Sequence, residues 1–417
     1  MAQTNKNKII NDPVHGFINI SHPLSFDIIE HPYFQRLRHI RQLGLTYLVY
    51  PGANHTRFQH ALGAMHLMNL AIDTLRSKGH EITEAEAEAA SAAILLHDIG
   101  HGPFSHSLEF SLAQRVGHEA ISKCFMHELN KQFGNRLNLA IAIFEGSYEK
   151  KFLHQLISGQ LDMDRMDYLR RDSFFSGVTE GAIGSERIIK MLNVVNGDLV
   201  VEAKGIYSVE KFIIARRLMY WQVYLHKTVI AAEKLLTQLL LRARDLTQQG
   251  EEVWATPSLY FFLRKSIVKK DFEQSSDGKP SEALLNFANL DDNDIITAAK
   301  LWVNHSDPVL SLLARMITSR KLFRVKLQNK PFAEQEVETR KQDLYSLYPT
   351  LRGMGKYFVL TDSVSNNAYR STEESIKILY NNGILFDITE ASDMLNTKIL
   401  SKDVRKYFLC YPKEIEK

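Results

Sequence analysis

The stretch AILLHDIGHGPFSHSLE, residues 93–109, combines an apolar run with an unusual density of titratable side chains. The run 93–96 leads directly into the adjacent pair His97 and Asp98, and His101 follows four residues after His97. Positions i and i+4 share one face of a helix. The spacing therefore predicts that both imidazoles point from a helix into one pocket, with the carboxylate of Asp98 close by.

The second half of this stretch adds further polar groups. Gly102-Pro103 is expected to end the helix, because proline lacks an amide donor and clashes with the preceding turn, and His106 and Glu109 follow. Adjacent imidazole and carboxylate groups suit a divalent transition metal or Mg²⁺ better than a thiolate-preferring ion. Capping or surface positions would explain one isolated histidine, whereas this density of histidines and acids favours a site.

Composition indicates an ordinary globular protein of about two to three domains. The chain has 417 residues and a formal net charge of +3, so any nucleotide or nucleic-acid site must be a local patch. Two cysteines, Cys124 and Cys410, are too few for a disulfide framework. The N-terminus lacks a signal-peptide pattern, and the apolar runs are shorter than a membrane span. We therefore expect a cytoplasmic protein with no membrane partner.

Hydrophobic periodicity predicts a mostly helical chain. A hairpin is expected at residues 8–20, helices are expected at 21–43, 54–79, 83–97 and 208–244, and the last 90 or so residues mix strand and helix patterns. Thr83 and Glu86 predict a capping box at the start of the helix at 83–97. Residues 328–335 are the best candidate for a boundary, which gives a helical core over 1–330 and a smaller α+β lobe over 331–417. Taken alone, residues 160–172 (QLDMDRMDYLRRD) are typical of a surface helix with many ion pairs.

Dispersed residues can supply a catalytic metal site, which needs two to four protein ligands and open positions for water and substrate. His60, His97 and Asp98 supply three ligands, and a fourth carboxylate is expected from the acidic cluster at 162–167. Two nitrogen and two oxygen ligands are compatible with Fe, Mn, Mg, Ni or Zn.

Other titratable residues could assist the chemistry. Three histidines remain for proton transfer to a leaving alkoxide: His101, His106 and His118. Glu109 or Glu119 could fix an imidazole tautomer, and arginines together with Lys227 could neutralise phosphate oxygens. A metal, an acid and a basic clamp together describe hydrolysis of a phosphate ester or anhydride.

The order His60, His97-Asp98, Asp164 resembles the H…HD…D signature of HD-domain phosphohydrolases. The blocks DPVHGFI, RLRHIRQLG, HTRFQHALG, HDIGHGPFSH, DMDRMDYLRRD and YLHK resemble the deoxynucleoside triphosphate triphosphohydrolases, especially the mammalian SAM- and HD-domain enzyme and its bacterial relatives. The resemblance covers about residues 8–320. It implies a helical HD-domain core, with the HD motif region at about 50–180, and a divalent metal at its centre.

The same resemblance implies roles for individual residues. The implied metal ligands are His60, His97, Asp98 and Asp164. Water would attack the α-phosphate and release deoxynucleoside and inorganic triphosphate, with His106 as general acid and Glu109 where an aspartate is usual. The remaining matches line the substrate: His101 and His118 along the phosphate channel, Arg57 at a phosphate, Gln42 and Leu43 near the sugar, and Tyr168, Asp172 and Tyr224 near the sugar and base.

Some features depart from that family. The matching blocks begin at Lys8, without a SAM domain. Lys8, Asn11 and Arg38 match a regulatory nucleotide site of the mammalian enzyme, but Glu30 replaces an aspartate there. A regulatory nucleotide and a dimer or tetramer are therefore expectations from the family.

Two alternatives remain open. The protein could be an HD phosphohydrolase for another nucleotide, such as a monophosphate or a signalling nucleotide, or a non-catalytic module that binds nucleotides or nucleic acid. The retained ligand set and the weak basicity speak against the second alternative.

Overall fold

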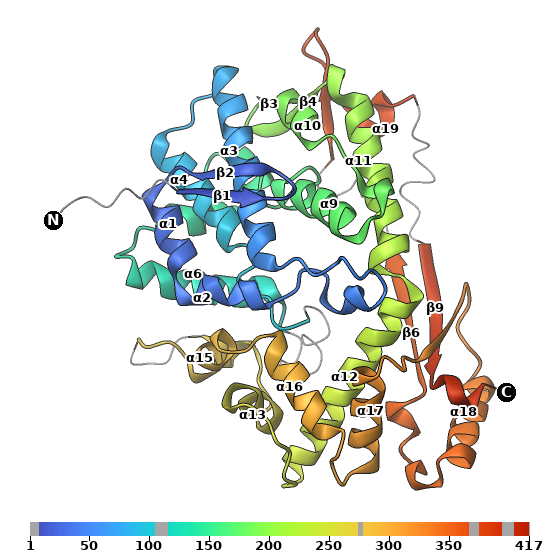
Figure 1. Ribbon diagram of the computed structural model, residues 1–417. Helices are drawn as coiled ribbons and strands as arrows, with labels where there is room; N and C mark the ends of the chain where they lie inside the picture. Colours follow the sequence, from blue (N-terminus) through green and yellow to red (C-terminus); the bar gives the residue numbers. More distant parts are fainter. Residues whose placement is uncertain (1–7, 105–115, 274–277, 367–374, 394–403, 417) are drawn as a thin grey trace.

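The computed structural model describes residues 8–104, 116–273, 278–366, 375–393 and 404–416. Helices dominate these residues, and short strands form three small sheets at the periphery (Figure 1). The prediction of a mostly helical chain with some strand in its C-terminal part is confirmed. Every described helix is too short or too polar to cross a lipid bilayer.

The first half of the described chain forms a helical layer capped by a hairpin. Strands β1 (Lys8–Asp12) and β2 (Gly16–Ile20) pair antiparallel, which confirms the predicted hairpin. The helices of this half are α1 (Pro23–Glu30), α2 (Pro32–Gln35), α3 (Arg57–Ser77), α4 (Glu84–Leu96), α6 (His118–Gln132), α7 (Asn138–Phe144), α8 (Lys151–Gln155), α9 (Met163–Ser176) and α10 (Ser185–Met191). Helix α3 packs between α4 and α9, so these three helices can direct side chains to one point.

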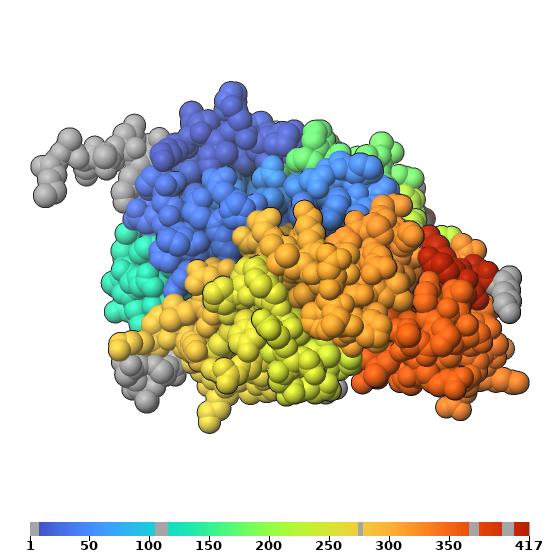
Figure 2. All heavy atoms as spheres, turned by 60° about the horizontal axis from the view of Figure 1, so that its bottom comes forward, coloured from blue at the N-terminus to red at the C-terminus, as the bar shows by residue number. Residues whose placement is uncertain are grey.

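The second half covers one end of that layer. Its helices are α11 (Ile206–Met219), α12 (Lys227–Gln248), α13 (Pro257–Arg264), α14 (Lys269–Phe272), α15 (Glu282–Ala288), α16 (Asp292–Trp302), α17 (Pro308–Thr318), α18 (Glu334–Leu347) and α19 (Ile388–Ala391). A π-helix at Tyr220–Tyr224 joins α11 to α12. In Figure 2 the yellow and orange segments that contain α13, α15, α16 and α17 lie against the blue N-terminal part.

C-terminal strands pair with strands from earlier in the chain. Strands β3 (Leu192–Val195), β4 (Asp198–Glu202), β7 (Lys377–Leu379) and β8 (Leu385–Asp387) form one sheet in that order. Strands β5 (Arg324–Gln328), β9 (Val404–Tyr411) and β6 (Leu360–Asn366) form another. Strand β7 pairs in parallel with β4, and β9 pairs antiparallel with β5. The division of the chain near residue 330 stays a prediction.

Helix α4 ends earlier than its sequence pattern predicts. The expectation that His97 and His101 share a helical face is wrong, because α4 ends at Leu96 and His97 is its C-cap. Ser122 of α6 accepts a hydrogen bond from the amide of Gly100 at 2.9 Å and donates one to the carbonyl of His97 at 2.8 Å. A side chain from another helix thus satisfies the backbone groups that a longer α4 would have paired internally.

The start of α4 is fixed by a buried carboxylate. The backbone amide of Thr83 donates to Glu86 at 2.8 Å, which confirms the predicted capping box. Tyr148 donates to the same carboxylate at 2.6 Å, and Lys150 does so at 2.9 Å. Burial alone would raise the pKa of Glu86, but the bonds from Lys150, Tyr148 and Thr83 outweigh it and lower the pKa to about 2.

We expect Glu86→Gln to lower the melting temperature at neutral pH. A carboxylate whose pKa falls from 4.5 in the unfolded chain to about 2 contributes up to about 3 kcal/mol. That contribution is complete above the unfolded pKa and is lost as the pH falls toward the folded pKa. Calorimetry should therefore give a larger difference between variant and wild type at pH 7 than at about pH 3.5. A difference that is equal at both pH values would contradict this, and exposed Glu84→Gln is the control.

Candidate metal centre and substrate cavity

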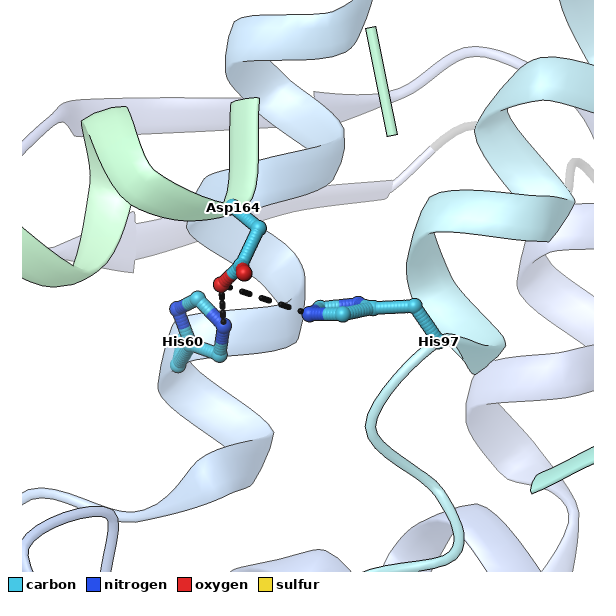
Figure 3. A group of neighbouring side chains, drawn as sticks. All are labelled: His60, His97 and Asp164. Atoms are coloured by element: carbon cyan, nitrogen blue, oxygen red, sulfur yellow. Dashed lines mark ion pairs between the residues drawn. The ribbon is translucent and has the colours of Figure 1, made fainter. Parts of the chain in front are cut away.

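The four predicted metal ligands converge on one point from three elements. His60 comes from α3, His97 follows the end of α4, and Asp164 lies in the first turn of α9 (Figure 3). Asp98 is the residue after His97. The Nε2 atom of His60 lies 3.1 Å from Oδ1 of Asp164 and 3.7 Å from Oδ2 of Asp98. The Nε2 atom of His97 lies 3.4 Å from an oxygen of each carboxylate.

Of the three aspartates in the 162–167 cluster, Asp164 is the one that faces both imidazoles. Asp162 instead caps α9, because it accepts hydrogen bonds from the amides of Arg165 at 2.7 Å and Gly159 at 3.0 Å. Asp167 lies on the far side of His60. The geometry therefore favours Asp164 as the fourth ligand.

The hydrogen bonds of the two imidazoles suit metal binding. The Nδ1 atom of His97 lies 2.6 Å from the carbonyl oxygen of Ile94, and Nδ1 of His60 lies 2.7 Å from Oδ2 of Asp167. Both Nδ1 atoms face acceptors and must carry the proton, which leaves a lone pair on Nε2. Both Nε2 atoms are buried and have no hydrogen-bond partner. Two orphaned nitrogens beside two carboxylates fit a divalent cation.

The electrostatics of the cluster point the same way. Burial would lower the pKa of His60, but Asp164 and Asp167 outweigh it and raise the pKa to about 10. Burial would raise the pKa of Asp98, but His97 and Arg57 hold it well below its usual range. The carboxylates thus stay ionised and attract a positive charge, which a divalent ion would supply in place of a proton.

A buried ion network supports His60 from behind. Asp167 accepts hydrogen bonds from Nδ1 of His60 at 2.7 Å and Nε2 of His15 at 2.6 Å. Arg171 donates to both oxygens of Asp167, at 2.9 and 3.0 Å, and to Asp12 at 2.7 Å. Asp12 and His15 belong to the β1–β2 hairpin. The hairpin is therefore tied to a candidate metal ligand through one aspartate.

The interpretation of residues 160–172 as a surface helix is wrong. Asp167 and Arg171 are fully buried against α3, where Gly63 leaves them room. A Cβ at Gly63 would lie 2.0 Å from Oδ1 of Asp167, so no larger residue fits there. Sequence reasoning missed Asp167, although its spacing of three residues from Asp164 places both on one helical face.

A cavity of about 450 Å³ opens beside the candidate metal centre. Most of the predicted site residues line it: Gln42, Leu43, Arg57, Asp98, His101, His118, Asp164, Tyr168, Asp172 and Tyr224. It also has lining residues that the sequence did not single out as site residues, including Thr46, Phe104, Arg165, Arg216 and Tyr220. Lys227 is exposed at the start of α12 and is not among the lining residues, and Glu119 is exposed on α6. His106 and Glu109 lie outside the described residues.

One end of the cavity carries imidazoles and guanidinium groups. The rings of His101 and His118 stack with their centroids 3.8 Å apart, and Nε2 of His101 lies 3.3 Å from Asp98. Arg57 hydrogen-bonds the other oxygen of Asp98. Asp98, His101 and His118 also form a second group whose ligand atoms lie close enough to hold a cation. Arg216 also lines the cavity, with its guanidinium group 5.9 Å from the ring centroid of Tyr220, and its buried Nε atom has no hydrogen-bond partner, which suits an anionic ligand.

The other end is aromatic and hydrogen-bonding. Tyr224 donates to Asp172 at 2.7 Å, and His55 contacts the second oxygen of Asp172 at 2.7 Å. Burial raises the pKa of Tyr224 well above its usual value, so its hydroxyl remains a donor. The π-helix turns Tyr220 and Tyr224 toward the cavity, with ring centroids 5.1 Å apart. A flat ring with polar edges fits this end.

We expect Asp167→Asn to weaken metal binding about 10- to 100-fold, the usual effect of losing a carboxylate behind a histidine ligand. Titration of the metal-loaded variant with a chelator measures this without any assay of turnover. Asp172→Asn is the matched control, because Asp172 is a buried aspartate of α9 that bonds His55 and Tyr224 instead. Equal metal affinity in both variants would rule out the supporting role of Asp167.

Comparison with known proteins agrees with this geometry. The HD domain family matches residues 57–172, and the HD associated region matches residues 183–253. An uncharacterised protein of Bacillus subtilis is 33% identical over 429 residues, which cover 99% of this chain and 94% of that protein. Human deoxynucleoside triphosphate triphosphohydrolase SAMHD1 is 31% identical over 282 residues, 57% of this chain and 45% of the human protein.

Solved structures extend the likeness to nearly the whole chain. A phosphohydrolase from Bacteroides thetaiotaomicron superposes with a TM-score of 0.93 at 54% identity and covers 97% of this chain and 99% of its own. A hypothetical protein from Aquifex aeolicus superposes with a TM-score of 0.71 at 27% identity, with coverage of 98% and 97%. With its H…HD…D residues gathered at one point, the chain belongs to the HD-domain phosphohydrolases.

Proposed function

We propose that this protein is a metal-dependent dNTP triphosphohydrolase, which converts a deoxynucleoside triphosphate into deoxynucleoside and inorganic triphosphate. Family membership supports the coarser statement that it is a phosphohydrolase. One observation supports the more specific dNTP triphosphohydrolase activity. A single cavity joins the candidate metal centre and a cationic end to an aromatic, hydrogen-bonding end. The likeness to deoxynucleoside triphosphate triphosphohydrolases over 57% of this chain adds support, although it spans only about half of the human relative.

The cationic end would bind and orient the triphosphate. A divalent ion held by His60, His97, Asp98 and Asp164 would supply a Lewis acid and a more acidic water; its identity among Mn, Fe, Mg, Ni and Zn is open. Several side chains are placed to neutralise phosphate oxygens: Arg57, His101, His118, Arg165 and Arg216. Exposed Lys227 would reach the phosphates only from the cavity rim.

The leaving group is the 5′-oxygen of the deoxynucleoside, which must gain a proton as the bond to the α-phosphorus breaks. His106, supported by Glu109, is the proposed donor. At the aromatic end, Tyr168, Asp172 and Tyr224 would contact sugar and base. Gln42 and Leu43 would form the wall beside the sugar.

A regulatory nucleotide and a homo-oligomer are further parts of the proposal, taken from the relatives. Lys8 matches the regulatory site and Glu30 replaces an aspartate there; both are exposed, and Nζ of Lys8 lies 3.9 Å from Oε1 of Glu30. Lys8 also lies 4.4 Å from the ring centroid of Phe26, and Arg38 stacks on Phe58 at 3.6 Å. Lys8 and Arg38 are thus two exposed cations that each lie beside an aromatic ring, which is compatible with binding a nucleotide.

Product analysis tests the reaction directly. Each dNTP is incubated with Mn²⁺ or Mg²⁺, with and without a guanine nucleotide as activator, and the phosphorus products are separated. We expect inorganic triphosphate and free deoxynucleoside. Orthophosphate released from nucleoside monophosphates would instead favour the alternative phosphohydrolase. No turnover under any condition, together with oligonucleotide binding, would favour a non-catalytic module.

Two substitutions separate metal binding from proton transfer. Asp98→Ala should abolish metal retention, because it removes a charged ligand. His106→Ala should retain the metal and lower turnover by about 10²- to 10⁴-fold, the usual contribution of a general acid. Metal content by mass spectrometry and turnover are measured on the same samples. A fully active His106→Ala protein would show that another group donates the proton.

A further inference from the structure

One carboxylate from a distant helix joins two walls of the substrate cavity. Asp292 lies at the start of α16, and its side chain is 2% exposed. Its Oδ1 atom accepts a hydrogen bond from the backbone amide of Phe104 at 3.0 Å. Its Oδ2 atom accepts one from the backbone amide of Arg41 at 3.1 Å. The guanidinium group of Arg41 also lies 3.3 Å from Oδ2.

Each of the two amides belongs to a segment that lines the cavity. Arg41 immediately precedes Gln42, Leu43 and Gly44, which form one wall. Phe104 lines the cavity as well and follows Asp98 and His101 in the same stretch of chain. Asp292 therefore links the segment beside the proposed sugar position with the segment that follows the HD pair.

The backbone at this junction needs an external support. Phe104 has φ +51°, a left-handed conformation that a side chain larger than glycine seldom adopts. Such a conformation persists only where surrounding contacts hold it. Gly44, with φ +50°, lies so close that an added Cβ would be 3.4 Å from the carbonyl oxygen of Phe104. The two walls are thus in contact, and the spacing between them depends on what holds their amides.

A buried arginine joins the same two regions nearby. Arg36 donates to the carbonyl of Ile99 at 2.7 Å and to the carbonyl of Leu290 at 3.2 Å. This contact anchors the turn after α4 to the residues just before α16. The hydrogen bonds of Arg36 thus fix the carboxylate of Asp292 relative to both walls. Because the site is buried, water cannot replace this carboxylate as the acceptor for the two amides.

We propose that Asp292 is a positioning residue that sets the spacing between the Gln42–Gly44 wall and Phe104, and thereby the sugar selectivity of the cavity. The part that concerns the sugar rests on the proposed function, whereas the part that concerns the spacing of the walls does not. Asp292 itself is not among the lining residues, so it acts through the two backbone segments.

Asp292→Asn tests this with a matched control on the same helix. The asparagine keeps the shape but has only one oxygen acceptor, so one of the two amides loses its partner. Asp294→Asn makes the same chemical change two residues further along α16, at a side chain that does not line the cavity. Asp294 accepts from the amide of Asp291 at 2.8 Å and the hydroxyl of Thr256 at 2.6 Å.

Two measurements are made on each variant of the full chain. Hydrogen–deuterium exchange, without nucleotide, reports the peptides that contain Arg41 and Phe104. We expect about tenfold faster exchange in at least one of them for Asp292→Asn and no change for Asp294→Asn. The ratio of kcat/KM for a dNTP to that for the matching ribonucleoside triphosphate should fall about tenfold in Asp292→Asn only, as a loss of sugar discrimination.

The outcomes separate the inference from the proposed function. Unchanged exchange at both peptides would overturn the role of Asp292 in holding the walls. Faster hydrogen–deuterium exchange in Asp292→Asn with an unchanged dNTP-to-ribonucleotide ratio of kcat/KM would show that Asp292 makes only a structural contact. That result would overturn its positioning role in sugar selectivity. If the wild type hydrolyses no triphosphate, the proposed function fails, and the selectivity claim fails with it, while exchange still decides whether Asp292 holds the walls. If Asp292→Asn does not fold, Asp292→Glu, which displaces both oxygens but keeps the charge, carries the same two measurements.

Discussion

The hydrogen bond between His60 and Asp167 is the interaction on which the rest of the site depends. It places the proton on Nδ1 and leaves the Nε2 lone pair facing His97, Asp98 and Asp164. Asp167 can remain ionised in the protein interior only because Arg171 and His15 satisfy both of its oxygens. The buried charges between the hairpin and His60 are therefore paired, while the Nε2 atoms of His60 and His97, which face the candidate metal position, have no hydrogen-bond partner.

This arrangement explains why the N-terminal hairpin and three separate helices must fold together before a site exists. Helix α3, the turn that follows α4, and helix α9 each contribute at least one ligand, and none of them has a complete set. Gly63 lets α3 and α9 approach closely enough for the carboxylates to reach the imidazoles. The substrate cavity lies on the open side of the same cluster, so a ligand bound in it would lie directly beside the proposed ion.

Local sequence patterns predicted the local features well. The hairpin at residues 8–20, the capping box at Thr83 and Glu86, and the His97-Asp98 pair after an apolar run all depend on neighbours in sequence. The end of α4 at Leu96 could not be predicted in this way, because Ser122 from α6 determines it. The contacts of Asp292 and His15 likewise join residues far apart in the chain, and no periodicity marks them. The roles of His106 and Glu109 stay predictions.

Anomalous diffraction from crystals grown with manganese is the most direct test of the central claim. The account predicts one strong peak within about 2.0–2.3 Å of Nε2 of His60, Nε2 of His97 and one oxygen each of Asp98 and Asp164. A peak held instead by Asp98, His101 and His118, or no peak at a saturating manganese concentration, would contradict it.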